Sequence, residues 1–255
     1  MAKKRLWRAL LAASNFLAAL GLSHAGAAAA CTVETFEGSS FTVCLVDTRH
    51  SELRLAWRDE AGKALRTFSR LNHVLGGDAR RVEFGMNAGM YEEDGTPIGL
   101  LVEDGKQHRP IETRDGDGNF YLKPNGVLSV AHNGTVHVET TEAFAAAHRR
   151  TEWATQSGPM LVVSGKLHPR ITKDGPSKNI RNAVGIRDAH TALFVISNTP
   201  VSFGRLARFL RDGLGCPDAL YLDGAISSLW VPSQRRRDQG AELGPMIVVL
   251  ERSKE

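Results

Sequence analysis

Short apolar runs separated by turn-forming residues constrain the fold of this chain more than any other feature. Such runs, rich in Val, Ile, Leu and Phe and bounded by Gly, Asn, Asp and Ser, are typical of β-strands. Asn-Gly pairs at residues 125–126 and 133–134 predict turns, the second joining two short strands as a hairpin. We predict strands at residues 41–46, 53–57, 82–86, 98–102, 120–122, 127–130, 136–138, 160–163, 183–186, 192–196, 219–222 and 246–250.

Helical spacing occurs in few segments. The clearest is residues 202–214, with Ser202 as the N-cap and Gly215 after the end. Shorter helices are predicted at 141–149 and 67–75. Because these helices do not alternate with the strands, we predict an α+β fold, a single domain of mixed or antiparallel β-sheets with a few packed helices.

Residues 1–30 have the pattern of a secretory signal peptide. Four basic residues (Lys3, Lys4, Arg5 and Arg8) precede an apolar run at residues 9–22, and an alanine-rich stretch ends at Ala30. The apolar run is too short to span a bilayer stably. We therefore predict a mature domain at 31–255, in the periplasm or secreted, with lipoprotein processing at Cys31 as the alternative.

The leader also accounts for the net positive charge. It holds four of the 32 Lys and Arg residues and none of the 28 Asp and Glu residues, so the mature chain carries 28 of each sign. This balance does not indicate a nucleic-acid binder.

Three cysteines follow the leader. Cys31 and Cys44 flank a predicted turn at residues 36–41, and export permits a disulfide across this hairpin, with Cys216 as a buried free thiol. Because three cysteines cannot all pair within one chain, the sequence leaves the connectivity open.

The strongest candidate for a reactive group is Asp223. It follows the buried strand at residues 219–222 and precedes Gly224, Ser227 and Ser228. A carboxylate at a strand end, beside a glycine that admits close backbone approach, is a common way to present a reactive group. The alternative is that Asp223 only closes a turn.

Further polar side chains follow other apolar strands, as a cleft at one edge of a sheet requires. Asn87 is expected to be exposed at the bend after one strand, and Ser157 to open another. Arg181 precedes a third strand and Asn198 follows a fourth. Each segment could instead be ordinary turn chemistry.

Several standard sites are excluded. Ser157 lacks the Gly-x-Ser-x-Gly elbow of serine hydrolases, and no zinc-type histidine spacing or nucleotide-binding glycine loop is present. Residues 115–119 begin like an EF-hand loop, but Phe120 stands at the required glycine and Gly126 at the required glutamate. A weaker calcium or magnesium contact there stays open, and otherwise no cofactor or metal is predicted.

In this order, these segments resemble the phosphodiester glycosidase family, with its N-acetylglucosamine-1-phosphodiester α-N-acetylglucosaminidase-like domain, and in particular its exported bacterial branch. The resemblance covers about residues 80–250. The family's Asn-Gly-Gly-aromatic, Ser-Gly, Arg-Thr-Ala-hydrophobic-Gly and Leu-Asp-Gly-Gly-Gly-Ser elements are similar to Asn87-Ala88-Gly89-Met90, Ser157-Gly158, Arg181-Asn182-Ala183-Val184-Gly185 and Leu222-Asp223-Gly224-Ala225-Ile226-Ser227. Ala88, Ala225 and Ile226 replace family glycines, and the bulkier loop beside Asp223 narrows the pocket or changes the sugar accepted.

The resemblance implies an exported hydrolase that cleaves the bond between a sugar's anomeric carbon and a phosphodiester, with an N-acetylhexosamine as the expected sugar. Arg181 would neutralise the phosphate, and Asp223 would act as nucleophile or as the base that activates water. No second catalytic carboxylate is marked. The predicted substrate-binding residues are Asn87, Gly89, Ser157, Gly158, Asn198, Gly224, Ser227 and Ser228.

Two alternatives remain. A non-catalytic envelope glycan-binding module could use the same cleft, and so could a glycosidase that acts on non-phosphorylated glycans. The expected partner in each case is a carbohydrate, with no nucleic acid and no membrane span in the mature chain.

Overall fold

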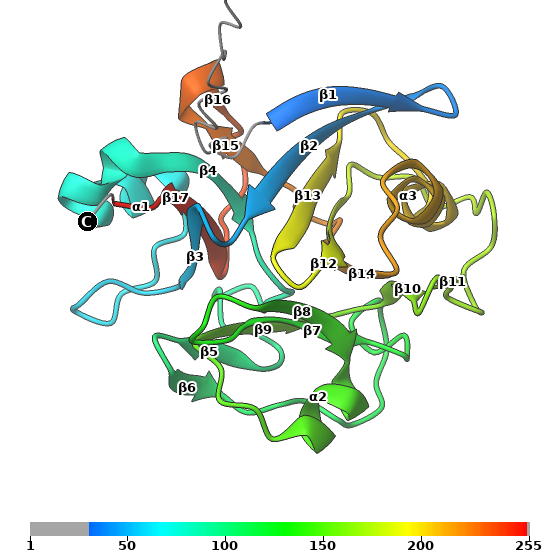
Figure 1. The fold of residues 1–255 in the computed structure, drawn as a ribbon, viewed down its shortest axis with the longest axis horizontal. Coiled ribbons are helices and arrows are strands. Elements are labelled where there is room, and N and C mark those ends of the chain that lie inside the picture. The colour runs from blue at the N-terminus through cyan, green and yellow to red at the C-terminus, as the bar shows by residue number, and fades with distance from the viewer. Residues whose placement is uncertain (1–30, 254–255) are drawn as a thin grey trace, which may run out of the picture.

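The computed structural model describes residues 31–253, which form one α+β domain with three antiparallel sheets and three helices (Figure 1). The predicted fold class is confirmed. The predicted leader at residues 1–30 lies outside the described residues. Among the residues that are described, no helix is long and apolar enough to cross a bilayer.

The largest sheet has seven strands in the order β1-β2-β13-β12-β14-β10-β11. Because β12 lies beside β14, Asn182 at the start of β12 is the register partner of Asp223 at the end of β14. The strands are β1 (Cys31–Phe36), β2 (Ser39–Asp47), β10 (Met160–Val163), β11 (Lys166–Leu167), β12 (Asn182–Asp188), β13 (Thr191–Ser197) and β14 (Asp218–Asp223).

Two five-stranded sheets pack against it. One has the order β16-β15-β4-β17-β3, and the other has the order β6-β5-β9-β7-β8. The first contains β3 (Ser51–Ala56), β4 (Val82–Asn87), β15 (Leu229–Val231), β16 (Arg236–Arg237) and β17 (Met246–Glu251). The second contains β5 (Leu101–Glu103), β6 (Lys106–Arg109), β7 (Gly126–Val130), β8 (Val136–Thr140) and β9 (Trp153–Ser157).

The main core lies where the inner faces of the three sheets meet. Its side chains come from all three, for example Phe194 on β13, Met86 on β4 and Leu128 on β7. A second apolar cluster fills the space between the outer face of the seven-stranded sheet and α3 (Phe203–Arg208). Since both faces of the central strands are covered, β13 is apolar almost throughout rather than alternating.

The predicted helices are present, although each is shorter than its apolar pattern. The N-cap of α3 is Ser202 as predicted, since its hydroxyl accepts a hydrogen bond from the Arg205 N–H at 3.2 Å. A π-helical turn (Phe209–Gly213) continues α3, and Gly215 follows with a φ of 69°. The other helices are α1 (Phe68–Leu75), followed by a 3-10 turn (Gly76–Arg81), and α2 (Thr141–Ala147); a second 3-10 turn is Pro232–Gln234.

Two sequence predictions near β7 are wrong. Residues 120–122 form turns rather than a strand. Phe120 is nevertheless buried, because its side chain packs into the protein from a loop. Gly126 is the first residue of β7 and not part of a turn. A side chain there would overlap the Met160 sulfur and the Glu139 carbonyl, so glycine is required for close packing.

The hairpin of β1 and β2 carries a disulfide that the sequence allowed but did not assign. Cys31 and Cys44 are register partners and are bonded, while Cys216 is buried and free. A cysteine sulfur in a disulfide cannot also carry a lipid, so this pairing disagrees with lipoprotein processing at Cys31.

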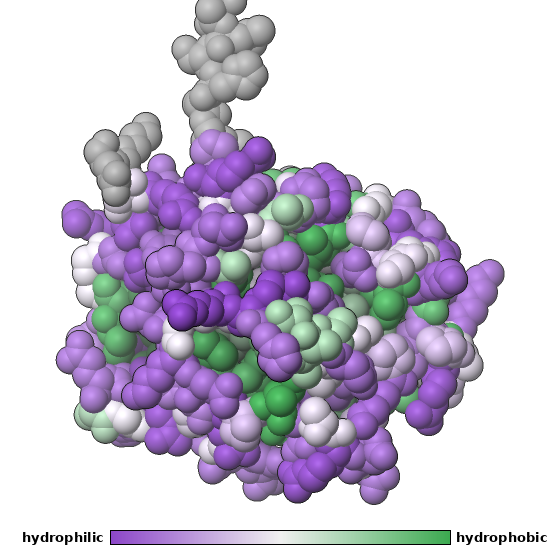
Figure 2. Space-filling model, turned by 60° about the horizontal axis from the view of Figure 1, so that its bottom comes forward, coloured by the Kyte–Doolittle hydropathy of each residue, from purple (hydrophilic) through white to green (hydrophobic). Residues whose placement is uncertain are grey.

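The surface on the side of the β5–β9 sheet is mostly hydrophilic, with apolar residues in small separate patches (Figure 2). Within residues 31–253, the exposed large hydrophobic side chains are Val33, Leu45 and Val74. They are dispersed over β1, β2 and α1, and exposed apolar residues scattered singly in this way need no functional explanation.

Candidate active site

The side chain of Asp223 turns back onto its own loop at the end of β14. Its Oδ1 accepts hydrogen bonds from the backbone N–H groups of Gly224 (2.5 Å), Ala225 (3.0 Å) and Ile226 (3.4 Å). Successive N–H groups directed at one oxygen form a cradle that favours an anion. Within residues 31–253, no hydrogen bond to Oδ2 is formed, so this oxygen has unused acceptor capacity.

Burial and hydrogen bonding act on Asp223 in opposite directions. The residue is 7% exposed, and this burial raises its pKa above the ordinary value, while the three loop N–H groups oppose the rise. A carboxyl group with a raised pKa is a better proton acceptor near neutral pH than an ordinary aspartate. Tyr91 lies close enough that the Asp223 charge adds to burial in raising the tyrosine's pKa.

Two asparagine side chains hold the Asp223 loop in place. The Oδ1 of Asn182 accepts the Asp223 N–H at 2.8 Å, and its Nδ2 donates to the Oδ1 of Asn87 at 3.0 Å. Asn87 in turn donates to the Ile226 carbonyl at 2.8 Å and accepts the Ser228 N–H at 2.8 Å. Because both amides are fully buried, these bonds rigidly connect β4, β12 and the loop after β14.

The guanidinium of Arg181 lies beneath the same loop, in a buried position. Its Nε donates to the Val201 carbonyl at 2.9 Å, and its Nη2 donates to the carbonyl and hydroxyl of Ser177 at 3.2 and 3.1 Å. The ring of Phe203 stacks on the guanidinium with 3.8 Å between the ring centroid and Cζ. Arg181 is 1% exposed, so it reaches a ligand only where one of these contacts opens.

Tyr221 connects Arg181 to the Asp223 loop. The Arg181 Nη1 donates to the Tyr221 hydroxyl at 2.8 Å. Any side chain at position 224 would overlap that hydroxyl and would approach Nη1 to 3.1 Å, so Gly224 rests directly on the Arg181–Tyr221 pair. The carboxylate and the guanidinium predicted from distant segments therefore lie on the same part of the molecule.

The predicted serines support the loop from both ends. Ser157, the last residue of β9, donates to the Leu222 carbonyl at 2.7 Å and is fully buried. Ser227 donates to the carbonyls of Asp223 and Ile180 at 3.0 and 3.1 Å. Ser157 therefore ends a strand, whereas the sequence predicted that it opens one.

Gly89 and Gly158 are packing positions next to these serines. A side chain at Gly89 would overlap the Gln156 carbonyl, and one at Gly158 would overlap the Phe120 carbonyl. Both glycines lie outside the cleft described next, so their direct role in substrate binding stays a prediction.

A cleft of about 600 Å³ is lined by residues 224–228, which follow Asp223, whereas Asp223 and Arg181 themselves are not among its lining residues. Ser228, Asn198 and Arg236 are among its lining residues, and Arg236 is held by Asp238 through two hydrogen bonds of 3.1 and 3.0 Å. Its size matches that of small-molecule sites in proteins. The full lining is Asn179, Ile180, Ser197, Asn198, Gly224, Ala225, Ile226, Ser227, Ser228, Arg236, Asp238, Gln239, Gly240 and Ala241.

The structure corrects a second feature of the predicted site and adds others. Asn87 is fully buried rather than exposed at a bend, because its amide is needed to hold the loop. Asn182 and Tyr221 are not among the site residues predicted from the sequence. Asn182 is part of the matching element that begins at Arg181, and Tyr221 directly precedes the one that begins at Leu222. Asp238 lies on the cleft wall and was not found, because nothing in its local sequence marks it.

The described part of the chain contains no evident set of metal ligands. Within residues 31–253, no group of three His, Cys, Asp or Glu side chains is placed to hold an ion. In the segment that begins like an EF-hand, Asp115 pairs with Lys123 at 2.8 Å, and Asp117 is exposed.

The described loops fall within a region that matches a known family. The phosphodiester glycosidase family matches residues 80–250, which include all four elements around Asp223. The curated protein YigE of Escherichia coli, which is uncharacterised, is 33% identical over 189 residues, with 73% of this chain and 72% of YigE covered. This chain belongs to the phosphodiester glycosidase family.

Solved structures agree with this family member's fold. The zebrafish N-acetylglucosamine-1-phosphodiester α-N-acetylglucosaminidase catalytic domain, solved as auto-inhibited by its pro-peptide, is similar with a TM-score of 0.61 and 12% identity over 90% of this chain and 86% of that one. A putative exported protein of Burkholderia pseudomallei is similar with a TM-score of 0.52 and 15% identity, over 83% and 74%. At these identities the likeness concerns the fold alone.

Proposed function

We propose that this family member is an exported glycosidase that hydrolyses the bond between a sugar's anomeric carbon and a phosphodiester, with an N-acetylhexosamine as the sugar. The observation that carries the proposal is the buried Asp223 carboxylate. One of its oxygens accepts hydrogen bonds from three loop N–H groups, and the other accepts none. The adjacent Gly224 packs directly against the Arg181–Tyr221 pair.

The proposed reaction needs one carboxylate, as base or nucleophile, and no second carboxyl group as general acid. The anomeric C–O bond breaks, and its electron pair leaves on the phosphate oxygen to give a phosphate monoester. Because this leaving group is far less basic than an alkoxide, it needs little help from a general acid. Asp223 either removes a proton from the attacking water or forms the intermediate that water then opens.

Arg181 is proposed to supply the positive charge for the phosphate. Its Nη2 now donates to Ser177, which lies on an exposed loop, and a phosphate oxygen can replace that hydroxyl as the acceptor. Arg236 and Asn198 on the cleft wall are proposed to contact the rest of the substrate.

A matched pair of variants tests these roles. Asp223→Asn keeps an acceptor for the loop N–H groups, so it is expected to fold while turnover of a sugar-1-phosphodiester falls by about 10²- to 10⁴-fold. Arg181→Lys is expected to weaken turnover of the phosphodiester more than that of a neutral aryl glycoside of the same sugar. Near-wild-type turnover by the purified Asp223→Asn protein would contradict the proposal.

The two alternatives differ in the products they give. A non-catalytic module binds the phosphodiester without forming product, and a glycosidase for non-phosphorylated glycans prefers the neutral glycoside. A screen of the exported protein against sugar-1-phosphodiesters and neutral glycosides distinguishes all three. The disulfide and the exported structural relative support a location outside the cytoplasm.

A further inference from the structure

A second hollow, of about 380 Å³, lies away from the Asp223 cleft. It forms where β3 of one five-stranded sheet meets the ends of β7 and β9 of the other, and the end of β17 closes one side. It has no lining residue in common with the cleft. The proposed catalytic chemistry therefore does not explain it.

Trp153 is one of the residues that line this hollow, and its side chain also packs against the edge of the main core. Trp153 is half-buried at the start of β9, whereas the other tryptophans of the described residues, Trp57 and Trp230, are 7% and 2% exposed. An aromatic ring that remains accessible at the wall of a polar recess can stack on the apolar face of a ligand.

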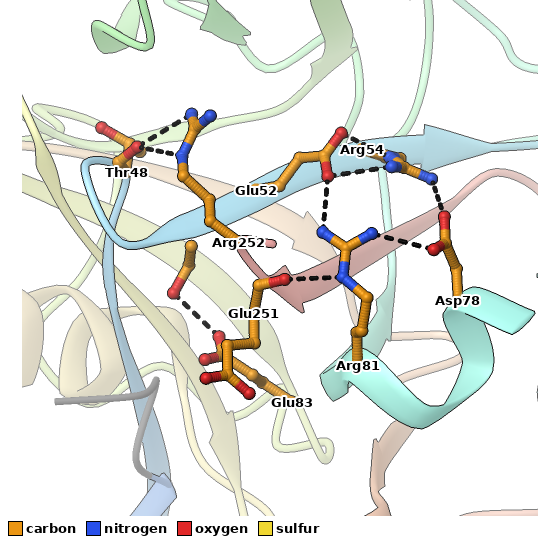
Figure 3. A network of polar contacts seen from close by, with 9 residues as sticks. Thr48, Glu52, Arg54, Asp78, Arg81, Glu83, Glu251 and Arg252 are labelled. Carbon is orange, nitrogen blue, oxygen red and sulfur yellow. Dashed lines mark hydrogen bonds and ion pairs between the residues drawn. The ribbon is translucent and has the colours of Figure 1, made fainter. Parts of the chain in front are cut away.

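The rest of the wall offers hydrogen-bond donors and acceptors that are already oriented. Glu52 accepts from Arg54 at 2.7 and 2.8 Å and from Arg81 at 3.2 Å. Arg252 donates through Nε and Nη2 to the Thr48 carbonyl at 3.3 and 3.1 Å. Figure 3 shows Arg252 turned toward Thr48 and Glu52 between the two arginines. These contacts hold the charged groups in place before any ligand arrives.

The balance of charges indicates what the hollow can bind. The residues that line it carry three carboxylates (Glu52, Asp104 and Glu152) and two guanidinium groups (Arg54 and Arg252), together with His132, which pairs with Glu152. Because these groups carry no net positive charge, they do not favour an anionic ligand. Sugar hydroxyls, which donate and accept together, match a wall of fixed acceptors and donors.

We infer that this hollow is a binding site for a neutral saccharide, separate from the site of cleavage. The sugar ring stacks on Trp153, and its hydroxyl groups bond to the carboxylates and guanidinium groups of the opposite wall. Such a site would hold a neutral part of a glycan on the protein while Asp223 acts elsewhere. The inference does not depend on the proposed reaction.

Tryptophan fluorescence and calorimetry test this site directly. The Asp223→Asn protein is titrated with neutral disaccharides, namely diacetylchitobiose, cellobiose and maltose, so that turnover does not interfere. At least one is expected to bind and to protect the accessible tryptophan from acrylamide quenching. Trp153→Ala is expected to weaken that binding by about tenfold or more, and Trp153→Phe to retain part of it because the ring persists.

A second variant covers the case in which Trp153→Ala does not fold. Asp104 is exposed on the hollow with a φ of 51°, so Asp104→Gly removes its side chain without backbone strain, and binding is expected to weaken. Turnover of a small sugar-1-phosphodiester is expected to be unchanged in both hollow variants. The inference is overturned if none of the disaccharides binds, if binding is insensitive to both hollow variants, or if only charged sugars bind.

Discussion

At the scale of single residues, Asp223 is the point on which the account depends. Burial disfavours the charged form of its carboxyl group, whereas three backbone N–H groups favour that form. Burial is the larger effect, so the pKa is raised. A buried carboxylate with a raised pKa reduces the stability of a fold at neutral pH, and functional sites commonly have this cost.

This imbalance predicts that Asp223→Asn stabilises the protein. Because the folded-state pKa lies above the ordinary 3.8, the stability that Asp223 contributes is fully present below that pH and is lost as the pH rises through the folded-state pKa. The variant should therefore unfold at higher denaturant concentration than the wild type at pH 7, with a smaller difference at pH 3. A larger difference at pH 3 would contradict this assignment.

At the scale of elements, Glu103 ties the β5–β6 hairpin to the end of β3. Its carboxylate accepts the Trp57 N–H at 2.9 Å and lies 3.3 Å from His108 Nε2. Burial raises the pKa of Glu103 to about 7, while burial lowers the pKa of His108. The connection between the two five-stranded sheets therefore contains a carboxyl group that titrates near neutrality.

Glu103→Gln is expected to change how stability depends on pH. The contribution of Glu103 is fully present below pH 4.5 and is lost as the pH rises to about 7. Relative to the wild type, the variant should gain stability across this window, as measured by urea unfolding at several pH values. Parallel pH profiles for the two proteins would show that Glu103 ionises with an ordinary pKa. Glu52→Gln is the control, because it changes a more exposed carboxylate on β3 whose pKa is lowered, against burial, by its bonds to Arg54 and Arg81, so its effect should have the opposite sign.

Elements with a strong apolar pattern were predictable, and those made by tertiary contacts were not. β13 and β14 could be recognised because both faces of each strand are covered, which gives continuous apolar runs. β6 (Lys-Gln-His-Arg) and β16 (Arg-Arg) are polar edge strands whose pairing leaves no signal in the sequence. Gly126 is wrongly predicted as a turn residue, because glycine is required there by close packing against Met160, which is distant in the sequence.

At the scale of the whole molecule, the candidate site is formed where strands from all three sheets end. Ser157 comes from the β5–β9 sheet, Asn87 from the sheet containing β4, and Asp223 from the largest sheet. The order of motifs allowed the sequence to place these residues in one site. It could not show that Asn87 and Ser157 bind the loop backbone, because hydrogen-bond partners depend on how the sheets meet.

The disulfide contributes at this scale by closing the N-terminal hairpin. Cys31 and Cys44 are separated by 13 residues, and a crosslink over such a distance stabilises a fold by about 3 kcal/mol in the chain-entropy estimate. The Cys31→Ser, Cys44→Ser double variant should lose stability of that order in urea unfolding. Cys216→Ser is the matched control, because Cys216 is not crosslinked. An unchanged unfolding midpoint in the double variant would contradict the prediction.

Turnover in water enriched in heavy oxygen distinguishes attack of water on the sugar carbon, which we propose, from attack on phosphorus. A sugar-1-phosphodiester is incubated with the purified protein, and the products are separated and weighed by mass spectrometry. We expect the label on the anomeric hydroxyl of the released sugar and not on the phosphate monoester, with about 10²- to 10⁴-fold less labelled product from Asp223→Asn. Label on the phosphate, or full labelling by the variant, would contradict this proposal.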